Sequence, residues 1–407
     1  MKNFLILAVS TAFVLTSVSC GKVDKNDDKE NPYAPLNLST KSSGFVESGN
    51  KFSFEFIDKL NSAENKDYIV SPLSLQIALG MLLNGAQGGT AEEIITMLGY
   101  GKDELEEVND YFLYLLNTLP KMDKKTTMSL ADAVFVNKNF PLLDAYKAQV
   151  AKSYLAQIDN LDFSDAEKVV GIVNAWCEKN TNGMIPHVLS DVNPNDVAYI
   201  LNALYFKSMW KHKFNAQYTT DMNFKTESGI GKKVPMMKQG EVFEYFENDI
   251  FQAVRLPYGN NAFAMTVFLP APGHKTSDVT AFLKNGGKYA FETKSVDLWL
   301  PKFETKFDIK LNDLLKSMGM KAAFSLGAAN FSAFSSEASC VSFVKQNAVI
   351  KVDEEGSEAA AVTSIGMANS PGPSFSKDFH ADHTFLYLIT ESSSGVILFA
   401  GRYSGEK

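Results

Sequence analysis

Apolar residues at helical spacing dominate the first half of the chain. One helix face is marked by Phe52, Phe56, Ile57 and Leu60. Residues 75–83 are apolar nearly all round, which predicts a buried helix, and Ser71 and Pro72 supply its cap and first turn. Capping-box patterns predict two further helices, which begin at Thr90 and Ser164.

Runs rich in β-branched and aromatic residues dominate the second half. They predict strands at residues 266–269, 296–300, 384–390 and 396–400. The last two runs are separated by a short polar stretch, which predicts a hairpin. Helices early and antiparallel strands late indicate the α+β class. Because no linker or repeat interrupts the chain, we expect one folded domain at residues 44–407.

One segment, residues 349–365, has the pattern of two strands joined by a flexible point. Residues 349–352 form an alternating apolar run, and Glu354, Glu355 and Gly356 follow it. Beyond Gly356 the side chains are very small, yet every second one would still share a face that can be buried. A surface loop needs no such face, whereas a loop that later becomes a strand inside a sheet does. The alternative is an alanine-rich linker after an edge strand.

This segment resembles the hinge of the reactive loop in serpins, which are protease inhibitors whose loop inserts into their main sheet. The resemblance extends through nearly all of the predicted domain. Motifs similar to those of the family follow one another in the family's order at residues 67–74, 83–91, 174–176, 181–185, 201–210, 234–237, 256–258, 301–303, 318–320, 379–383 and 399–402. Each motif is short, but their number and order make the resemblance specific.

The resemblance implies helices packed on a large, mostly antiparallel sheet, with smaller sheets and an exposed reactive loop. It implies a suicide-substrate inhibitor of serine proteases, or of papain-like cysteine proteases, which traps its target as a covalent acyl-enzyme when the cleaved loop inserts. We expect a monomer that is not an enzyme and needs no cofactor. The alternative is a non-inhibitory serpin used as a binding protein, which large or charged inward-facing hinge residues would favour. The hinge positions are Glu355, Gly356, Ser357, Glu358, Ala359, Ala360 and Ala361.

The same resemblance locates the bond that a target would cut. The family's spacing from the hinge glycine leaves three candidate bonds: Ser370–Pro371, Asn369–Ser370 and Met367–Ala368. No lysine or arginine lies between Ser357 and Ser376. Because the pocket of a trypsin-like enzyme requires a cation, we expect elastase- or subtilisin-like targets instead.

In the family, a buried polar cluster lies where the sheet must open. By motif position this cluster falls on Ser71, Ser74, Asn202 and Gln346. Glutamine stands where histidine is common, and it can form hydrogen bonds but cannot become cationic. A pH dependence of sheet opening is therefore not expected from Gln346.

The sequence does not support nucleic-acid binding, a histidine metal site or cysteine catalysis. The net charge of -8 and the pI of about 5.3 provide no basic excess for binding nucleic acid. His380 and His383 suggest a metal pair, but on a strand this spacing places their rings on opposite faces, so no metal site is predicted. Cys177 and Cys340 lie in regular helical and strand-like patterns and are predicted to be buried thiols rather than catalytic ones.

The N-terminus resembles a bacterial lipoprotein signal. The apolar residues 4–18 are too few to span a bilayer comfortably, and small residues precede Cys20. We expect a signal peptide at residues 1–19, a lipid on Cys20 and a flexible tether at residues 20–43. This predicts an exported protein that is anchored by lipid to a bacterial membrane, at the outer membrane or the cell surface. The alternative is an ordinary secretory signal with an incidental cysteine.

Overall fold

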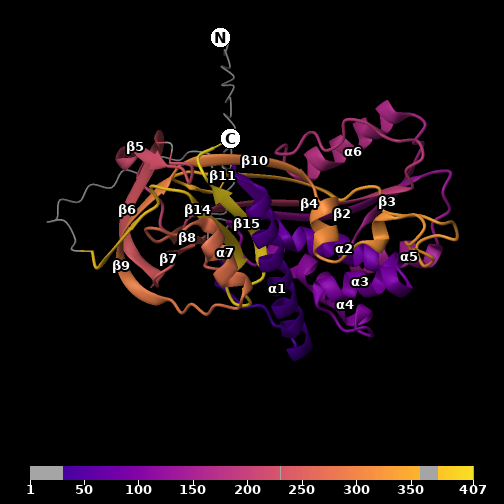
Figure 1. Ribbon diagram of the computed structural model, residues 1–407, viewed down its shortest axis with the longest axis horizontal. Coiled ribbons are helices and arrows are strands. Elements are labelled where there is room, and N and C mark those ends of the chain that lie inside the picture. The colour runs from indigo at the N-terminus through magenta and orange to yellow at the C-terminus, as the bar shows by residue number, and fades with distance from the viewer. Residues whose placement is uncertain (1–30, 230, 358–374, 407) are drawn as a thin grey trace, which may run out of the picture.

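The computed structural model describes residues 31–229, 231–357 and 375–406. These residues form two β-sheets. The helices are α1 (Thr40–Ala63), α2 (Pro72–Gly85), α3 (Gly88–Leu98), α4 (Leu105–Thr118), α5 (Asp144–Ser153), α6 (Ala166–Asn180), α7 (Thr276–Lys284) and α8 (Asn312–Ser317). Within the described residues, none of these helices is long and apolar enough to cross a membrane. Helix α6 lies on one side of the strands β2 (Thr127–Asn137) and β4 (Ala198–Met209), while α2 to α5 lie on the opposite side (Figure 1).

The strands of the first sheet follow the order β10 (Phe303–Lys310), β11 (Lys345–Val352), β12 (Gly356–Ser357), β4 (Ala198–Met209), β2 (Thr127–Asn137) and β3 (Gln157–Leu161). Among the described residues, this sheet has helices against both faces only at its β2 and β4 strands, and the outer positions of β10 and β11 are partly exposed. Helix α6 lies on one side of β2 and β4, and α2 lies on the other (Figure 1). On β4, Leu201 and Ala203 pack in the core under α6, whereas Leu204 and Phe206 belong to the main core with α2.

The second sheet is mostly antiparallel. Its strands follow the order β1 (Tyr68–Val70), β15 (Ile397–Tyr403), β14 (Phe385–Glu391), β8 (Phe263–Pro270), β7 (Phe251–Pro257), β6 (Gly231–Glu247), β9 (Glu292–Pro301) and β13 (Lys377–His380), and β5 (Thr220–Lys225) pairs with β6. Strands β14 and β15 pair as the predicted hairpin. The predicted α+β class, with helices on mostly antiparallel sheets, is confirmed.

The predicted tether of residues 20–43 extends too far along the chain. Helix α1 begins at Thr40, inside that range. Leu36 and Leu38 pack against the main core, and the backbone N–H of Leu36 donates a 3.0 Å hydrogen bond to Ser393 Oγ. The described part of this stretch therefore belongs to the folded body, because its apolar residues reach the core.

Of the three predicted helix starts, one is confirmed and two are wrong. Ser71 caps α2, and its side chain accepts a hydrogen bond from the first turn, as predicted. The prediction for α3 was wrong, because the helix begins at Gly88 and Thr90 is buried inside its first turn. Asp165, rather than the predicted Ser164, caps α6 with its side chain. Local sequence located all three helices but missed two of their caps.

Candidate functional site

Strand β12 fills only one end of a position in the six-stranded sheet. Gly356 pairs with Met209 and Ser357 pairs with Ser208 of β4, while Ser357 also pairs with Val352 of β11. Both pairings are antiparallel, so β4 and β11 run parallel to each other on either side of β12. Among the described residues, this ladder ends at Ser357, although β4 and β11 both continue well beyond it.

The two residues of β12 are fitted closely into the sheet. A Cβ atom on Gly356 would lie 2.0 Å from the carbonyl oxygen of Ser208, so only glycine fits. The hydroxyl of Ser357 lies 2.6 Å from that of Tyr258, and both residues are buried. The side chain of Ser357 therefore points into the molecule, on the same side of the sheet as Ser208 and the main core.

The acidic pair before Gly356 is held by cations. Lys302 donates a 2.7 Å hydrogen bond to Glu354, and Lys213 pairs with Glu355. Burial favours a higher pKa for the Glu354 carboxyl, but the hydrogen bonds from Lys302 and Thr219 outweigh it and hold the pKa below its usual value. The chain is thus fixed to the body up to the start of β12, and the freedom predicted for the hinge is not seen at Gly356 itself.

The structure brings together the four residues predicted for the polar cluster. Gln346 accepts a 3.0 Å hydrogen bond from the backbone N–H of Ser71 and donates a 2.9 Å bond to the Ser71 carbonyl oxygen. Ser71 Oγ accepts from the backbone N–H of Ser74, and the Ser74 hydroxyl donates to Asn202 Oδ1. The cluster thereby connects α2 to β4 and β11, the two strands that flank the position of β12.

Sequence reasoning missed a fifth member of this cluster, Asp132 on β2. Asn202 Nδ2 donates a 2.7 Å hydrogen bond to Asp132 Oδ1, and Oδ2 is buried without a hydrogen-bond partner among the described residues. Burial raises the pKa of this carboxyl to about 7, although the bond from Asn202 favours the charged form. An acidic residue on the alternating strand at residues 127–137 was the available signal. From here on, the polar cluster means Ser71, Ser74, Asp132, Asn202 and Gln346.

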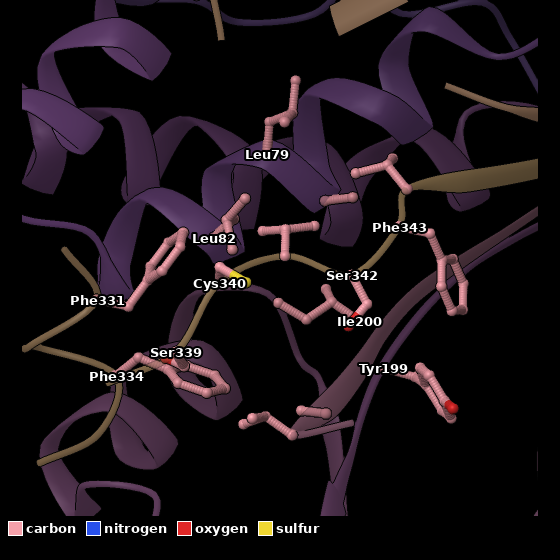
Figure 2. Close-up of a pocket in the computed structure, with 15 residues that line it drawn as sticks. Leu79, Leu82, Tyr199, Ile200, Phe331, Phe334, Ser339, Cys340, Ser342 and Phe343 are labelled. Atoms are coloured by element: carbon pink, nitrogen blue, oxygen red, sulfur yellow. The ribbon is translucent and has the colours of Figure 1, made fainter. Parts of the chain in front are cut away.

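A cavity of about 70 Å³ lies at the far end of the position that β12 enters. Figure 2 shows Leu79 and Leu82 of α2 among its lining residues, together with Ile200 of β4. The chain just before β11 supplies Ser339, whose hydroxyl is buried without a partner among the described residues, and Cys340. The cavity is thus mainly apolar and open to a further side chain between β4 and the start of β11.

Both cysteines of the folded part are free. Cys177 is buried as predicted, and burial raises the pKa of its thiol to about 12. Cys340 is only half-buried, so its predicted burial was partly wrong, and desolvation raises the pKa of its thiol as well. A raised pKa disfavours the thiolate, so neither residue has the character of a nucleophile.

The remaining predicted site residues lie outside the described residues. They are Cys20, Glu358, Ala359, Ala360, Ala361, Met367, Asn369, Ser370 and Pro371.

Comparison with known proteins identifies the family. Residues 47–405 match the family described as "Serpin (serine protease inhibitor)". The chain is 33% identical over 371 residues to the leukocyte elastase inhibitor of Xenopus laevis, covering 87% of this chain and 97% of that protein. It is 32% identical to an uncharacterized serpin-like protein of Thermococcus kodakarensis, covering 88% of this chain and 85% of that one. This chain therefore belongs to the serpin family.

Solved structures agree with this assignment. The thermophilic serpin tengpin in its native state is similar with a TM-score of 0.81 and 27% identity, covering 92% of this chain and 96% of tengpin. Human thyroxine-binding globulin, solved in complex with its ligand, is similar with a TM-score of 0.78 and 25% identity, covering 89% and 98%. The predicted serpin fold is confirmed.

Proposed function

We propose that this protein inhibits proteases by inserting residues 358–367 as the strand missing between β4 and β11. The observation that carries the proposal is the register of β12, which already pairs with both neighbours at the entrance to this position. Continued residue by residue, the same antiparallel register reaches Ala198, the first residue of β4, at Met367. The chain thus has enough residues after Ser357 to fill the whole length of β4.

Side-chain sizes support this register on the inner face of the sheet. Because Ser357 points inward, every second residue after it would also point inward. Ala359 would then lie opposite Phe206, and Ala361 opposite Leu204, both of which are buried in the main core. Small loop residues would meet large core residues, so a new strand could enter without overpacking.

Polar side chains support the same register on both faces. Thr363 would lie between Asn202 and Gln346, so its hydroxyl would enter the polar cluster on the inner face. On the outer face, Glu358 would lie between Lys207 and Lys351, which gives a carboxylate two cationic neighbours. Of the three polar residues among residues 358–367, Glu358 and Thr363 would find charged or polar partners in this register.

The cavity supports the register at its far end. Ile365 would lie opposite Ile200, and Met367 opposite Ala198, and both of these β4 residues line the cavity. Both loop side chains would point inward, towards α2. The cavity would thus be filled by two apolar side chains, which adds burial that the protein lacks before insertion.

The chemistry of trapping would begin on the target. Its nucleophile would attack the carbonyl carbon of the residue before the cut, forming an ester or thioester while the peptide bond breaks and the new amine takes a proton. The candidate bonds remain Ser370–Pro371, Asn369–Ser370 and Met367–Ala368. Insertion of the freed segment would draw the attached protease along the sheet before water completes hydrolysis. The uninserted fold would therefore be kinetically rather than thermodynamically stable.

The test is incubation with a panel of elastase-like, subtilisin-like, papain-like and trypsin-like proteases. We expect a complex that survives denaturing electrophoresis with elastase- or subtilisin-like enzymes, and N-terminal sequencing of the released C-terminal peptide identifies the cut bond. Trypsin should be inhibited much more slowly, because the loop offers no cation to the acid in its pocket. Complexes with trypsin alone would overturn this specificity, and loop cleavage without any complex would support a non-inhibitory binding protein instead.

We also propose that the protein is exported and anchored to a bacterial membrane through a lipid on Cys20. The small residues before this cysteine and the apolar stretch at residues 4–18 support the proposal. Two or more acyl chains anchor a protein firmly, whereas one holds it only marginally. Cys20→Ala should block processing or release the protein from the membrane fraction, as cell fractionation and mass spectrometry of the mature N-terminus would show. A soluble wild-type protein that begins at another residue would contradict the anchor without affecting the inhibitor proposal.

A further inference from the structure

Three side chains of types that can bind a metal ion lie close together where strand β13 pairs with β9. The two strands pair in parallel, with Asp378 opposite Asp297 and His380 opposite Trp299. Because alternate residues of a strand share a face, both aspartates and His380 project from the same side of the sheet. One ligand atom from each of the three residues lies within 4.8 Å of the other two, and His380 Nε2 is 3.0 Å from Asp297 Oδ2.

Among the described residues, the only salt bridge to either aspartate comes from His380, which is charged only when protonated. Asp297 and Asp378 are directly opposite each other on neighbouring strands, an arrangement that is destabilising for like charges. In the described part of the chain, no lysine or arginine forms a salt bridge with either aspartate. The nearest cations by register are engaged elsewhere, because Lys238 lies over the ring of Trp299 at 4.6 Å and Lys377 pairs with Glu247. A cation between the two carboxylates would remove this repulsion.

The imidazole ring is held ready for such a cation. The rings of His380 and Trp299 are stacked, with centroids 3.7 Å apart and planes 14° from parallel. This contact fixes the ring plane and keeps Nε2 beside the carboxylate of Asp297. His380 and Asp297 are only partly exposed, so two of the three ligands are restrained before an ion arrives.

We propose that Asp297, Asp378 and His380 bind a divalent transition-metal ion, with Zn²⁺ as the ion that the donor set fits best. One imidazole nitrogen and two carboxylate oxygens are a donor set that Zn²⁺ accepts, with water completing the tetrahedron. Magnesium and calcium prefer ligand sets made only of oxygen, so the histidine disfavours them. His383, the residue that sequence alone pairs with His380, is not part of the site, because its ring bonds Asp382 and the carbonyl oxygen of Pro270.

The position of the site indicates what the ion would do. Among the described residues, strand β13 is the edge strand of its sheet, has four residues and pairs on one side only, with β9. In the sequence it follows shortly after residues 358–374, the segment that contains the candidate reactive bonds. An ion held by Asp297 on β9 and by two residues on β13 would fasten this short edge strand to the sheet. This role does not depend on the proposed inhibitory function.

The test is titration of the metal-stripped full-length protein with ZnCl₂ by isothermal calorimetry. We expect one saturable site, with an affinity that falls by about tenfold or more in Asp378→Asn and in His380→Gln, since each removes one ligand. The matched control is His274→Gln, because His274 and Asp278 form an exposed pair of the same chemistry that lacks the third ligand. This control should bind Zn²⁺ like the wild type.

A second measurement distinguishes a loss of metal binding from misfolding of a variant. Zn²⁺ should slow hydrogen exchange of the β13 amides in the wild type and in His274→Gln, but not in Asp378→Asn, and circular dichroism would verify that all variants are folded. Replacement of Zn²⁺ by Co²⁺ should give visible absorption bands that Asp378→Asn abolishes. Absence of saturable binding at millimolar ZnCl₂, or equal binding by the wild type and Asp378→Asn, would overturn the site.

Discussion

Asp132 and Asn202 face each other across β2 and β4, and Asn202 Nδ2 donates a 2.7 Å hydrogen bond to Asp132 Oδ1. The second carboxyl oxygen of Asp132 is buried and has no hydrogen-bond partner among the described residues. Burial raises the pKa of this carboxyl to about 7. The polar cluster therefore contains a group, Asp132, that changes charge near neutral pH. Gln346, in contrast, cannot change charge.

This pKa predicts how stability depends on pH. The folded state binds the Asp132 proton up to about pH 7, whereas the unfolded chain releases it near pH 3.8, so this group's contribution to the free energy of unfolding falls as pH rises between these values. Above pH 7 the loss is complete, and it amounts to roughly 4 kcal/mol at most. Asp132→Asn should remove this dependence and be the more stable protein at pH 8.

The measurement is the midpoint of urea unfolding for both proteins at a series of pH values. The difference in favour of Asp132→Asn should grow between pH 4 and pH 7 and then level off. Asp221→Asn, at an exposed position of β5, is the control and should show no such trend. A difference that is constant across this range would mean that the buried carboxyl does not titrate there.

A charged residue on the inner face of the inserting segment should convert the inhibitor into a substrate. By the register of β12, Ala361 would lie between Leu204 and Ala348, both buried. Arginine there would place an unpaired charge in the core, at a cost of roughly several kcal/mol. Ala361→Arg should be cleaved without forming denaturant-resistant complexes, whereas Ala361→Gly should retain them. Wild-type stoichiometry for Ala361→Arg would exclude insertion as the mechanism.

Cleavage in the loop should stabilise the protein rather than loosen it. A cut within residues 364–375 would free the segment to pair with β4 and β11 along their length, which adds hydrogen bonds and burial. Differential scanning calorimetry should show a sharp rise in the melting temperature after such a cut. Nicked Ala361→Arg should rise much less. An unchanged or lower melting temperature of the nicked wild type would favour a non-inhibitory serpin.

The elements that sequence predicted well are those decided by neighbouring residues. The cap at Ser71 and the pairing of β14 with β15 follow from short-range patterns, and both are present. Thr90 failed as a cap because tertiary structure overrides the local pattern: its hydroxyl accepts a hydrogen bond from the backbone of Asn330, far along the chain. The tether boundary failed for a similar reason, since the apolar side chain of Leu36 finds the core.

The sequence predicted only those residues of the candidate site that the serpin resemblance indicates. The resemblance indicated Ser71, Asn202 and Gln346, and the structure places them together. Asp132 was missed because an acid on a strand is normally exposed, whereas this one is buried beside Asn202. The trio around His380 was missed because its third ligand, on β9, is adjacent only through strand pairing. Register and burial, which decide such sites, are properties of the assembled sheets.

Filling the cavity beside β4 should raise the stability of the uncleaved protein and lower the efficiency of inhibition. The cavity is lined by Ala78 of α2, and the proposed register places Ile365 and Met367 there after insertion. In Ala78→Leu the added side chain would occupy this space beforehand, which should raise the stability of the uncleaved protein by about 1 kcal/mol. The same side chain should then overpack the inserted state, at a cost of about 1–3 kcal/mol.

The melting temperature of Ala78→Leu should therefore be higher than that of the wild type before cleavage, and its gain on cleavage should be smaller. More of the variant should also be consumed as substrate for each protease molecule trapped. Ala281→Leu, on α7 and away from both flanking strands, is the control for a similar change in size on a helix. If Ala78→Leu inhibits with wild-type stoichiometry and gains as much stability on cleavage, the loop does not reach this cavity, and the strand must stop short of Ile200.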